Sequence, residues 1–156
     1  MKTSMEGILI VAENRKARHE YEILKTYEAG LVLMGSEVKS LRDRQIQLKD
    51  AYVSFRGNEA FLQNAHVAVY KASSYNNHEP ERLRKLLLNR NELIHIMESI
   101  QEKGLTCVPL KVYFKKGRAK VEIALAKGRK LHDKREAIKK RDVSMELRKS
   151  MQKSRR

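Results

Sequence analysis

The side chains that could do chemistry in this sequence do not form a pattern that would support catalysis. The five histidines show no metal-ligand spacing, and Cys107, the single cysteine, cannot alone form a disulfide or a thiolate metal site. A nuclease would need clustered carboxylates, and a nucleotide hydrolase a Gly-rich phosphate loop ending in Lys-Ser or Lys-Thr; the sequence contains neither pattern. We therefore expect no catalytic residue, no metal site, no cofactor and no enzyme activity.

Two of the histidines lie among cations. His19 follows Arg15, Lys16 and Arg18, and His132 lies within the basic segment 130–135. An imidazole can stack on an unpaired base while neighbouring cations neutralise phosphates, so both histidines are candidates for RNA contact, although the residues alone do not favour this over a structural role. His66 and His95 fall in a predicted strand and a predicted helix, where we expect structural roles.

The charge of the whole chain indicates a polyanionic partner. There are 34 Lys and Arg against 19 Asp and Glu, a formal net charge of +15, whereas a modest net charge is enough for solubility. Nucleic acid is the leading partner. A membrane surface would require a long apolar span, a lipidation signal or a strongly amphipathic basic helix, and none is convincing. The apolar run 8–11 is too short for a signal peptide, which predicts a cytoplasmic location.

Hydrophobic periodicity and turn signals divide the chain into strands and a few helices. The predicted elements are a long strand over residues 21–33, a short helix over 36–42, a hairpin or meander over 51–70, a helix over 89–104 and a hairpin over 108–125. Residues 73–80 read as a surface loop. Many short strands with few helices favour an antiparallel barrel of the oligonucleotide-binding (OB) class with two or three flanking helices.

Several residues mark the expected bends, caps and faces. Gly30 is the expected bend of the long strand, and Ser36 the expected cap of the short helix. Asn89 begins the later helix, with Glu92 completing a capping pattern, and Gly104 ends it. In the last hairpin the side chains of one parity are expected to share a single buried face: Val108, Leu110, Val112, Phe114, Val121, Ile123 and Leu125.

The composition changes at Gly128. Residues 128–156 carry 12 Lys and Arg against 4 Asp and Glu, a net charge of +8, and contain no Pro and no further Gly. We therefore divide the chain into a barrel over residues 1–127 and a basic tail over residues 128–156. Because the apolar residues of the tail form no wide stripe, we expect it to be disordered alone and helical when bound to RNA.

Five segments resemble the SsrA-binding protein family in residues, order and spacing. They are NRKARHEY (14–21), YEAGLVL (27–33), GSEVKSLR (35–42), RKLLLN (84–89) and LAKGRKLHDKR (125–135). The resemblance covers the chain from Asn14 to about Arg141. Residues 71–79 follow no firm family pattern, and beyond Arg141 the sequence lacks an aromatic residue that many relatives have.

The resemblance implies a function in trans-translation, the rescue of stalled ribosomes. The OB-like barrel would grip the tRNA-like domain of transfer-messenger RNA at its D-loop and elbow. Alanyl-tRNA synthetase and elongation factor Tu would act indirectly, through the RNA. The tail would lie as a helix in the empty mRNA channel of the small subunit, next to the decoding centre, and so report that no messenger is present.

Residue by residue, the resemblance implies two sets of contacts. The positions that match the family's contacts with the tRNA-like domain, together with the neighbouring Arg18, are Asn14, Arg18, His19, Glu28, Leu87, Asn89 and Lys120. The positions that match the ribosome-facing junction and tail are Lys127, Gly128, His132, Asp133, Lys134 and Arg135. A carboxylate such as Glu28 fits RNA where it accepts hydrogen bonds from base amines, as on guanine or cytosine.

The residues alone leave other interpretations open. Leu87 could belong to the core, Asn89 could only cap its helix, and Glu28 could only pair with a cation. For the whole chain the alternative is a structural ribosomal protein with a basic extension, and a metal-dependent RNA nuclease is a distant third interpretation because it would need a carboxylate cluster.

Overall fold

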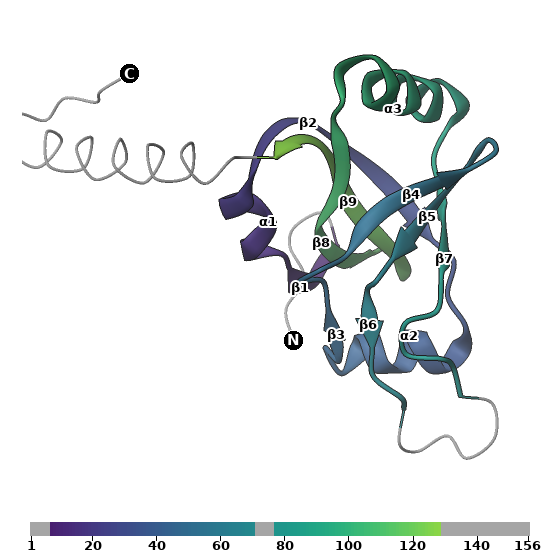
Figure 1. Cartoon of the computed structure of the whole chain (residues 1–156). Helices are drawn as coiled ribbons and strands as arrows, with labels where there is room; N and C mark the ends of the chain where they lie inside the picture. The colour runs from purple at the N-terminus through teal and green to yellow at the C-terminus, as the bar shows by residue number, and fades with distance from the viewer. Residues whose placement is uncertain (1–6, 71–76, 129–156) are drawn as a thin grey trace, which may run out of the picture.

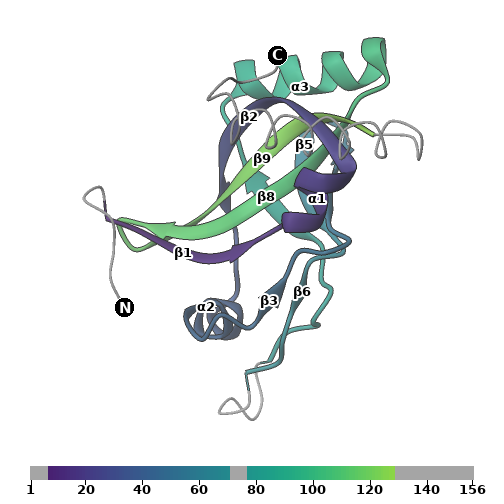
Figure 2. The same cartoon turned by 90° about the vertical axis from the view of Figure 1, so that its left-hand side faces the viewer.

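The computed structural model describes residues 7–70 and 77–128, and the structural statements below concern these residues (Figure 1). Their elements, in chain order, are β1 (Ile8–Glu13), α1 (Arg15–Glu20), β2 (Tyr21–Leu31), α2 (Gly35–Arg42), β3 (Ile46–Gln47), β4 (Tyr52–Arg56), β5 (Glu59–Gln63), β6 (His66–Val67), β7 (Arg84–Leu87), α3 (Arg90–Lys103), β8 (Thr106–Lys115) and β9 (Arg118–Gly128). The helices α2 and α3 lie at opposite ends of the body (Figures 1 and 2).

Seven strands form one antiparallel sheet that curls on itself. The strand order is β1-β8-β9-β2-β7-β5-β4, and β3 pairs with β6 in a separate small sheet. The edge strand β4 packs against β8 near the other edge, which brings the two ends of the sheet together. Figure 2 shows this curvature from the side of α1. The predicted mainly β, antiparallel OB-like fold with flanking helices is confirmed for the described residues.

The inside of the curled sheet holds the main core. Side chains from most of the strands and from α2 and α3 fill it, among them Tyr27, Ala29, Leu41, Leu62, Ile96, Val112, Phe114, Val121 and Ile123. Cys107 is also in this core, with 1% of its surface exposed. Burial raises the pKa of its thiol to about 12.

A second, smaller core lies on the other side of the sheet, under α1. It contains Ala17 of α1 with Val108, Leu110 and two alanines of β9. The prediction that Val108 and Leu110 share the face of Val112 was therefore wrong. The reason is a bulge: the register between β8 and β9 shifts between Pro109 and Lys111, and an inserted residue reverses the side-chain alternation. A proline, which donates no ladder hydrogen bond, is typical of such a position.

The long strand and the last helix form as predicted. Asn89 caps α3 by accepting a hydrogen bond from the backbone N–H of Glu92 at 3.2 Å, and Gly104 ends the helix at φ 63°. The irregular point of β2 is a register shift between Ile23 and Lys25. Gly30 instead pairs regularly with Leu87 of β7 and allows the two strands to lie close together. A Cβ placed at Gly30 would lie 3.2 Å from the Cβ of Leu87.

The start of α2 differs from the prediction. Met34 occupies the N-cap position, and Ser36 lies inside the helix, buried, with its hydroxyl 2.8 Å from Nδ1 of His78. The helix start is held by Glu37, whose Oε1 accepts a hydrogen bond from the backbone N–H of Met34 at 2.8 Å. Ser36 is not the cap, because its hydroxyl is used in a tertiary contact with a segment that the sequence presents as a surface loop.

Candidate nucleic-acid interface

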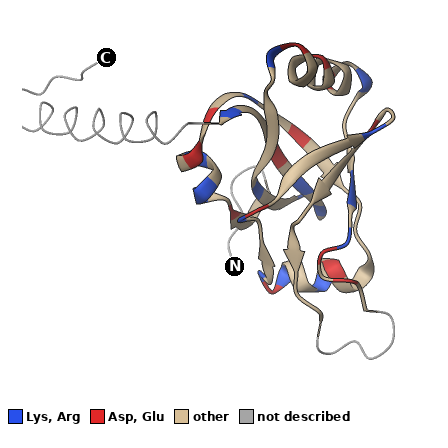
Figure 3. Ribbon diagram, in the orientation of Figure 1, with Lys and Arg blue, Asp and Glu red and all other residues tan. Residues whose placement is uncertain are grey.

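The face of the sheet that points away from the main core carries charged side chains across several strands. Cross-strand partners share a face, so the register places Glu28 of β2 beside Glu122 of β9, and Gly30 beside Lys120. The next strand adds Lys111, Tyr113 and Lys115 of β8 in the same rows. We call this surface of β2, β9 and β8 the outer face. Figure 3 shows basic and acidic residues over α1 and the sheet. Because Glu28 and Glu122 both lie on it, the outer face is not uniformly cationic.

Glu28 is the acidic centre of the outer face. Its Oε2 accepts a hydrogen bond from the hydroxyl of Tyr113, and the Nζ of Lys115 lies 3.4 Å from the same oxygen. The hydrogen bond from Tyr113 is the main cause that holds the pKa of Glu28 below its ordinary value, helped by Lys115 and Lys120 against the effect of burial. The carboxylate is therefore charged at neutral pH, and 39% of its side chain is exposed.

Leu87 and Lys120 lie on either side of Gly30 and border a shallow groove. The groove has a volume of about 280 Å³ and is lined by both apolar and basic side chains, including Leu31, Phe114 and Arg118. Leu87 is 55% exposed, which excludes the interpretation that it is a core residue. An exposed leucine beside two cations offers an apolar contact for a base edge together with charges for phosphate.

The helix α1 places its cations next to the outer face. Arg18 and His19 are exposed in its last turn, and Nη2 of Arg18 lies 3.6 Å from Oε1 of Glu122. This contact offsets part of the repulsion between Glu122 and Glu28, which pair directly across the strands.

Asn14 is 3% exposed, and its side-chain hydrogen bonds are internal. Its Nδ2 donates to the carbonyls of Leu48 at 3.1 Å and of Pro109 at 3.0 Å, and its Oδ1 accepts from the backbone N–H of Ala17 at 3.1 Å. The structure thus places Asn14 under α1, where it caps the helix and ties it to β8. Any effect of Asn14 on a ligand would pass through the position of α1.

The remaining predicted residues are only partly described. Asn89 is exposed at the start of α3, and its Oδ1 is engaged in the cap. Lys127 and Gly128 are exposed at the end of β9. The four predicted tail residues lie outside the described part of the chain: His132, Asp133, Lys134 and Arg135.

Beneath the surface, a buried ion network joins α2 to β7 and the segment before it. Both side chains of the pair Glu37 and Arg84 are fully buried, and Arg82 donates from Nη2 to Oε1 of Glu37 at 2.6 Å. Arg84 also donates to the carbonyls of Ala65 at 3.0 Å and Pro80 at 3.1 Å. The sequence analysis did not predict this network. The signal that was available is that Glu37 and Arg84 both lie in segments that resemble the family.

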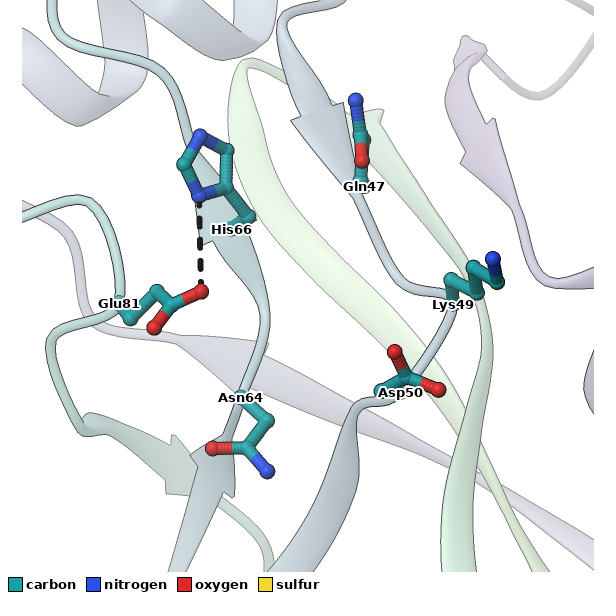
Figure 4. Close-up of a pocket in the computed structure, with 6 residues that line it drawn as sticks. All are labelled: Gln47, Lys49, Asp50, Asn64, His66 and Glu81. Atoms are coloured by element: carbon teal, nitrogen blue, oxygen red, sulfur yellow. Dashed lines mark ion pairs between the residues drawn. The ribbon is translucent and has the colours of Figure 1, made fainter.

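A second concave site is polar, and none of the outer-face residues named above lines it. Its volume is about 390 Å³, and it is lined by Gln47, Lys49, Asp50, Asn64, His66 and Glu81 (Figure 4). Both carboxylates have partners, since Nδ1 of His66 lies 3.7 Å from Glu81 and Nζ of Lys16 lies 3.0 Å from Asp50. This cavity lacks the surplus of cations found on the outer face, which therefore remains the better candidate for a polyanion.

Within residues 7–70 and 77–128, no group of three or more His, Cys, Asp or Glu side chains is placed to hold a metal ion. In the same part of the chain, no helix has both the length and the apolar character needed to cross a membrane.

Comparison with known proteins gives a consistent set of relatives. A family model described as "SmpB protein" matches residues 11–153. The "SsrA-binding protein" of Bdellovibrio bacteriovorus is 69% identical over 96% of this chain and 99% of its own length. The protein of the same description from Syntrophobacter fumaroxidans is 51% identical over 93% and 90%.

A solved structure is similar as well. It is described as "tmRNA-SmpB: a journey to the center of the bacterial ribosome", and one of its chains has a TM-score of 0.67 at 47% identity. The match covers 81% of this chain and 93% of that chain. The arrangement of strands and helices described above is thus one that has been seen in a solved structure of a relative.

Proposed function

This chain belongs to the SsrA-binding protein family, and on that premise we propose that it binds transfer-messenger RNA and delivers it to stalled ribosomes in trans-translation. The observation that carries the proposal is the identity of 69% over 96% of the chain with a protein described as SsrA-binding. The structure supports it with an exposed carboxylate, an exposed leucine and cations on one face of an OB-like sheet, which is a common surface for single-stranded RNA.

The outer face and α1 are the proposed contact with the tRNA-like domain. Lys120 and Arg18 would neutralise phosphates, His19 would stack on an unpaired base, and Leu87 would make an apolar contact. Glu28 would accept a hydrogen bond from a base amine. Asn14 would support this surface from within, as the cap of α1. Asn89 is exposed, and it would contact the RNA as well as cap α3.

The tail is the proposed reader of the empty messenger channel. Its net charge of +8 suits a channel that is walled by ribosomal RNA and no longer holds the messenger. The division between a barrel over residues 1–127 and a tail over 128–156 follows from this, with Lys127 and Gly128 at the junction and residues 132–135 facing the ribosome. In this scheme the protein acts in the cytoplasm and is not an enzyme, and alanyl-tRNA synthetase and elongation factor Tu reach it only through the RNA.

Two variants separate the two proposed activities. A chain ended after Gly128 is expected to bind the tRNA-like domain nearly as well as the full chain, but to abolish alanine incorporation on stalled ribosomes. Glu28→Ala in the full chain is expected to weaken RNA binding instead. The measurements are a filter-binding titration with the isolated tRNA-like domain and a translation assay on messenger without a stop codon.

Loss of RNA binding in the shortened chain would contradict the division of labour. The competing assignment, a structural ribosomal protein, predicts a different result: one copy on every ribosome, retained through a high-salt wash. Sequencing the RNA recovered with the protein from cells distinguishes the two directly, because the proposal predicts one dominant species with a tRNA-like end.

A further inference from the structure

We propose that Tyr113 is a positioning residue for RNA recognition, which fixes the Glu28 carboxylate so that one oxygen, Oε1, is presented to a single N–H donor of the RNA. The inference rests on the proposed function, and it adds a specificity-determining residue that the sequence did not indicate. Tyr113 itself would touch Glu28 and not need to touch the RNA.

The geometry separates the two oxygens of the carboxylate. Oε2 of Glu28 accepts the hydrogen bond from the Tyr113 hydroxyl and also lies 3.4 Å from Nζ of Lys115. Oε1 receives no hydrogen bond from any of the residues that the structure describes. The side chain of Glu28 is 39% exposed, so this oxygen can meet a ligand on the outer face.

Of the two donors to Oε2, only Tyr113 is fixed in place. Tyr113 is 5% exposed, lies near the end of β8, and is flanked across the strands by Ile10 and Lys120. Its hydroxyl therefore cannot move away without disturbing the sheet, and a tyrosine has only two side-chain torsions to immobilise. Lys115 has a long flexible side chain and is 36% exposed, so it contributes charge more than orientation.

This arrangement limits which base edge can be read. Recognition of guanine through N1–H and the N2 amine together would use both carboxylate oxygens, as in other two-point contacts. With Oε2 already occupied, the remaining oxygen suits one exocyclic amine, such as N2 of guanine, N4 of cytosine or N6 of adenine. Because an ionised carboxylate only accepts hydrogen bonds, the site rejects carbonyl edges in the same position.

The test uses the full chain and a hydroxyl deletion. Tyr113→Phe keeps the ring and removes the hydrogen bond to Glu28. Tyr70→Phe is the matched control, since its hydroxyl has no hydrogen bond within the described ranges and its ring lies near Lys39, 5.6 Å from that ammonium. Binding of the isolated tRNA-like domain is measured for both variants, each also combined with Glu28→Ala, after thermal unfolding has shown that the proteins are folded.

Tyr113→Phe is expected to weaken binding by roughly threefold to tenfold, the usual worth of one hydrogen bond, while Tyr70→Phe leaves it unchanged. In the Glu28→Ala background the same change is expected to have no effect, because its target is absent. Unchanged binding by Tyr113→Phe, or an equal loss in both backgrounds, would overturn the proposal. If the unmodified chain failed to bind the RNA at all, the proposed function would fail instead.

A pH profile provides a second readout that does not depend on the size of the affinity loss. The groups that face Glu28 are Tyr113 and Lys115 of β8 with Lys120 and Glu122 of β9. Removing the hydroxyl raises the pKa of Glu28 towards its ordinary value, so RNA binding by Tyr113→Phe is expected to fall off at a higher pH than for the unmodified chain. If RNA binding by the two proteins fell at the same acidic pH, the proposed role of Tyr113 would be contradicted.

Discussion

The Nε of Arg84 lies 2.6 Å from Oε2 of Glu37, and both side chains are completely buried. Such a pair contributes little net stability over an apolar pair of the same shape, but leaving one charge without its partner is costly. Arg84 opens β7, the strand that also carries Leu87 of the outer face. The network therefore anchors the first residue of the strand that carries the exposed leucine.

Glu37→Ala is expected to lower the free energy of unfolding by about 3–5 kcal/mol, because it leaves the Arg84 guanidinium buried without its carboxylate. The matched control is Glu59→Ala, which breaks the exposed pair with Lys85, 2.6 Å apart, and is expected to cost less than about 1 kcal/mol. Urea unfolding at neutral pH measures both. Similar values for the two variants would show that the buried network has no special role.

The effect of Glu37→Ala depends on pH. Burial by itself would raise the pKa of Glu37, but hydrogen bonds from Arg82, from the backbone N–H of Met34 and from Arg84 outweigh it, and the pKa is held below its ordinary value of 4.5. Because folding lowers the pKa of Glu37, its ionised carboxylate stabilises the folded state. This stabilisation is complete at pH values above the ordinary pKa, and it is lost as the pH falls through the lower pKa of the folded state. The stability difference between the unmodified chain and the variant is thus expected to be constant from pH 7 to about pH 5 and to shrink on further acidification. A difference that grew towards acid pH would contradict the network.

Lys120→Ala tests the phosphate-binding role of the outer face. Removing one phosphate contact is expected to weaken binding to the tRNA-like domain and to reduce the slope of log affinity against log salt by about 0.7 to 0.9. Arg56→Ala is the matched loss of one charge, at the end of the edge strand β4 and outside the groove that Lys120 borders. It is expected to leave the slope unchanged, and an equal fall for both variants would point to a diffuse charge effect rather than a site.

Gly30→Ala tests the close approach of β2 and β7. The added Cβ would lie 3.2 Å from the Cβ of Leu87, so the strands or Leu87 must shift, and we expect a loss of about 1 kcal/mol in stability together with weaker RNA binding. The control is Gly35→Ala in α2, where an added Cβ meets nothing within 4 Å. It is expected to be neutral or slightly stabilising. Unchanged stability and RNA affinity for Gly30→Ala would show that the outer face tolerates the shift.

Much of the fold was predictable because its signals are local. The turns at residues 57–58 and 115–118, the caps at Asn89 and Gly104, and the alternation in the strands depend on neighbours within a few residues. Exposed Leu87 shows the limit of such signals, because an apolar residue in an apolar run reads as core from the sequence. Leu87 is exposed because its side chain lies on the outer face of the sheet, and the pairing of β7 with β2 decides this.

Short and irregular elements required the tertiary structure. The strand β7 and the helix α1 are four and six residues long, and elements of that length are held by contacts with distant residues rather than by propensity. The bulge between Pro109 and Lys111 reversed the expected faces of Val108 and Leu110. A one-residue shift of this kind is decided by the partner strand and the covering helix.

The sequence by itself determined the charge, several strands of the barrel, the basic composition of the tail and the resemblance to a family, because these are properties of composition and local order. Only the tertiary structure decided that Asn14 is turned inward, that Glu28 is held by Tyr113, and that Glu37 and Arg84 form a buried pair. The physical reason is sequence separation: Glu28 and Tyr113 are 85 residues apart. Their contact exists because β2, β9 and β8 lie side by side in one register.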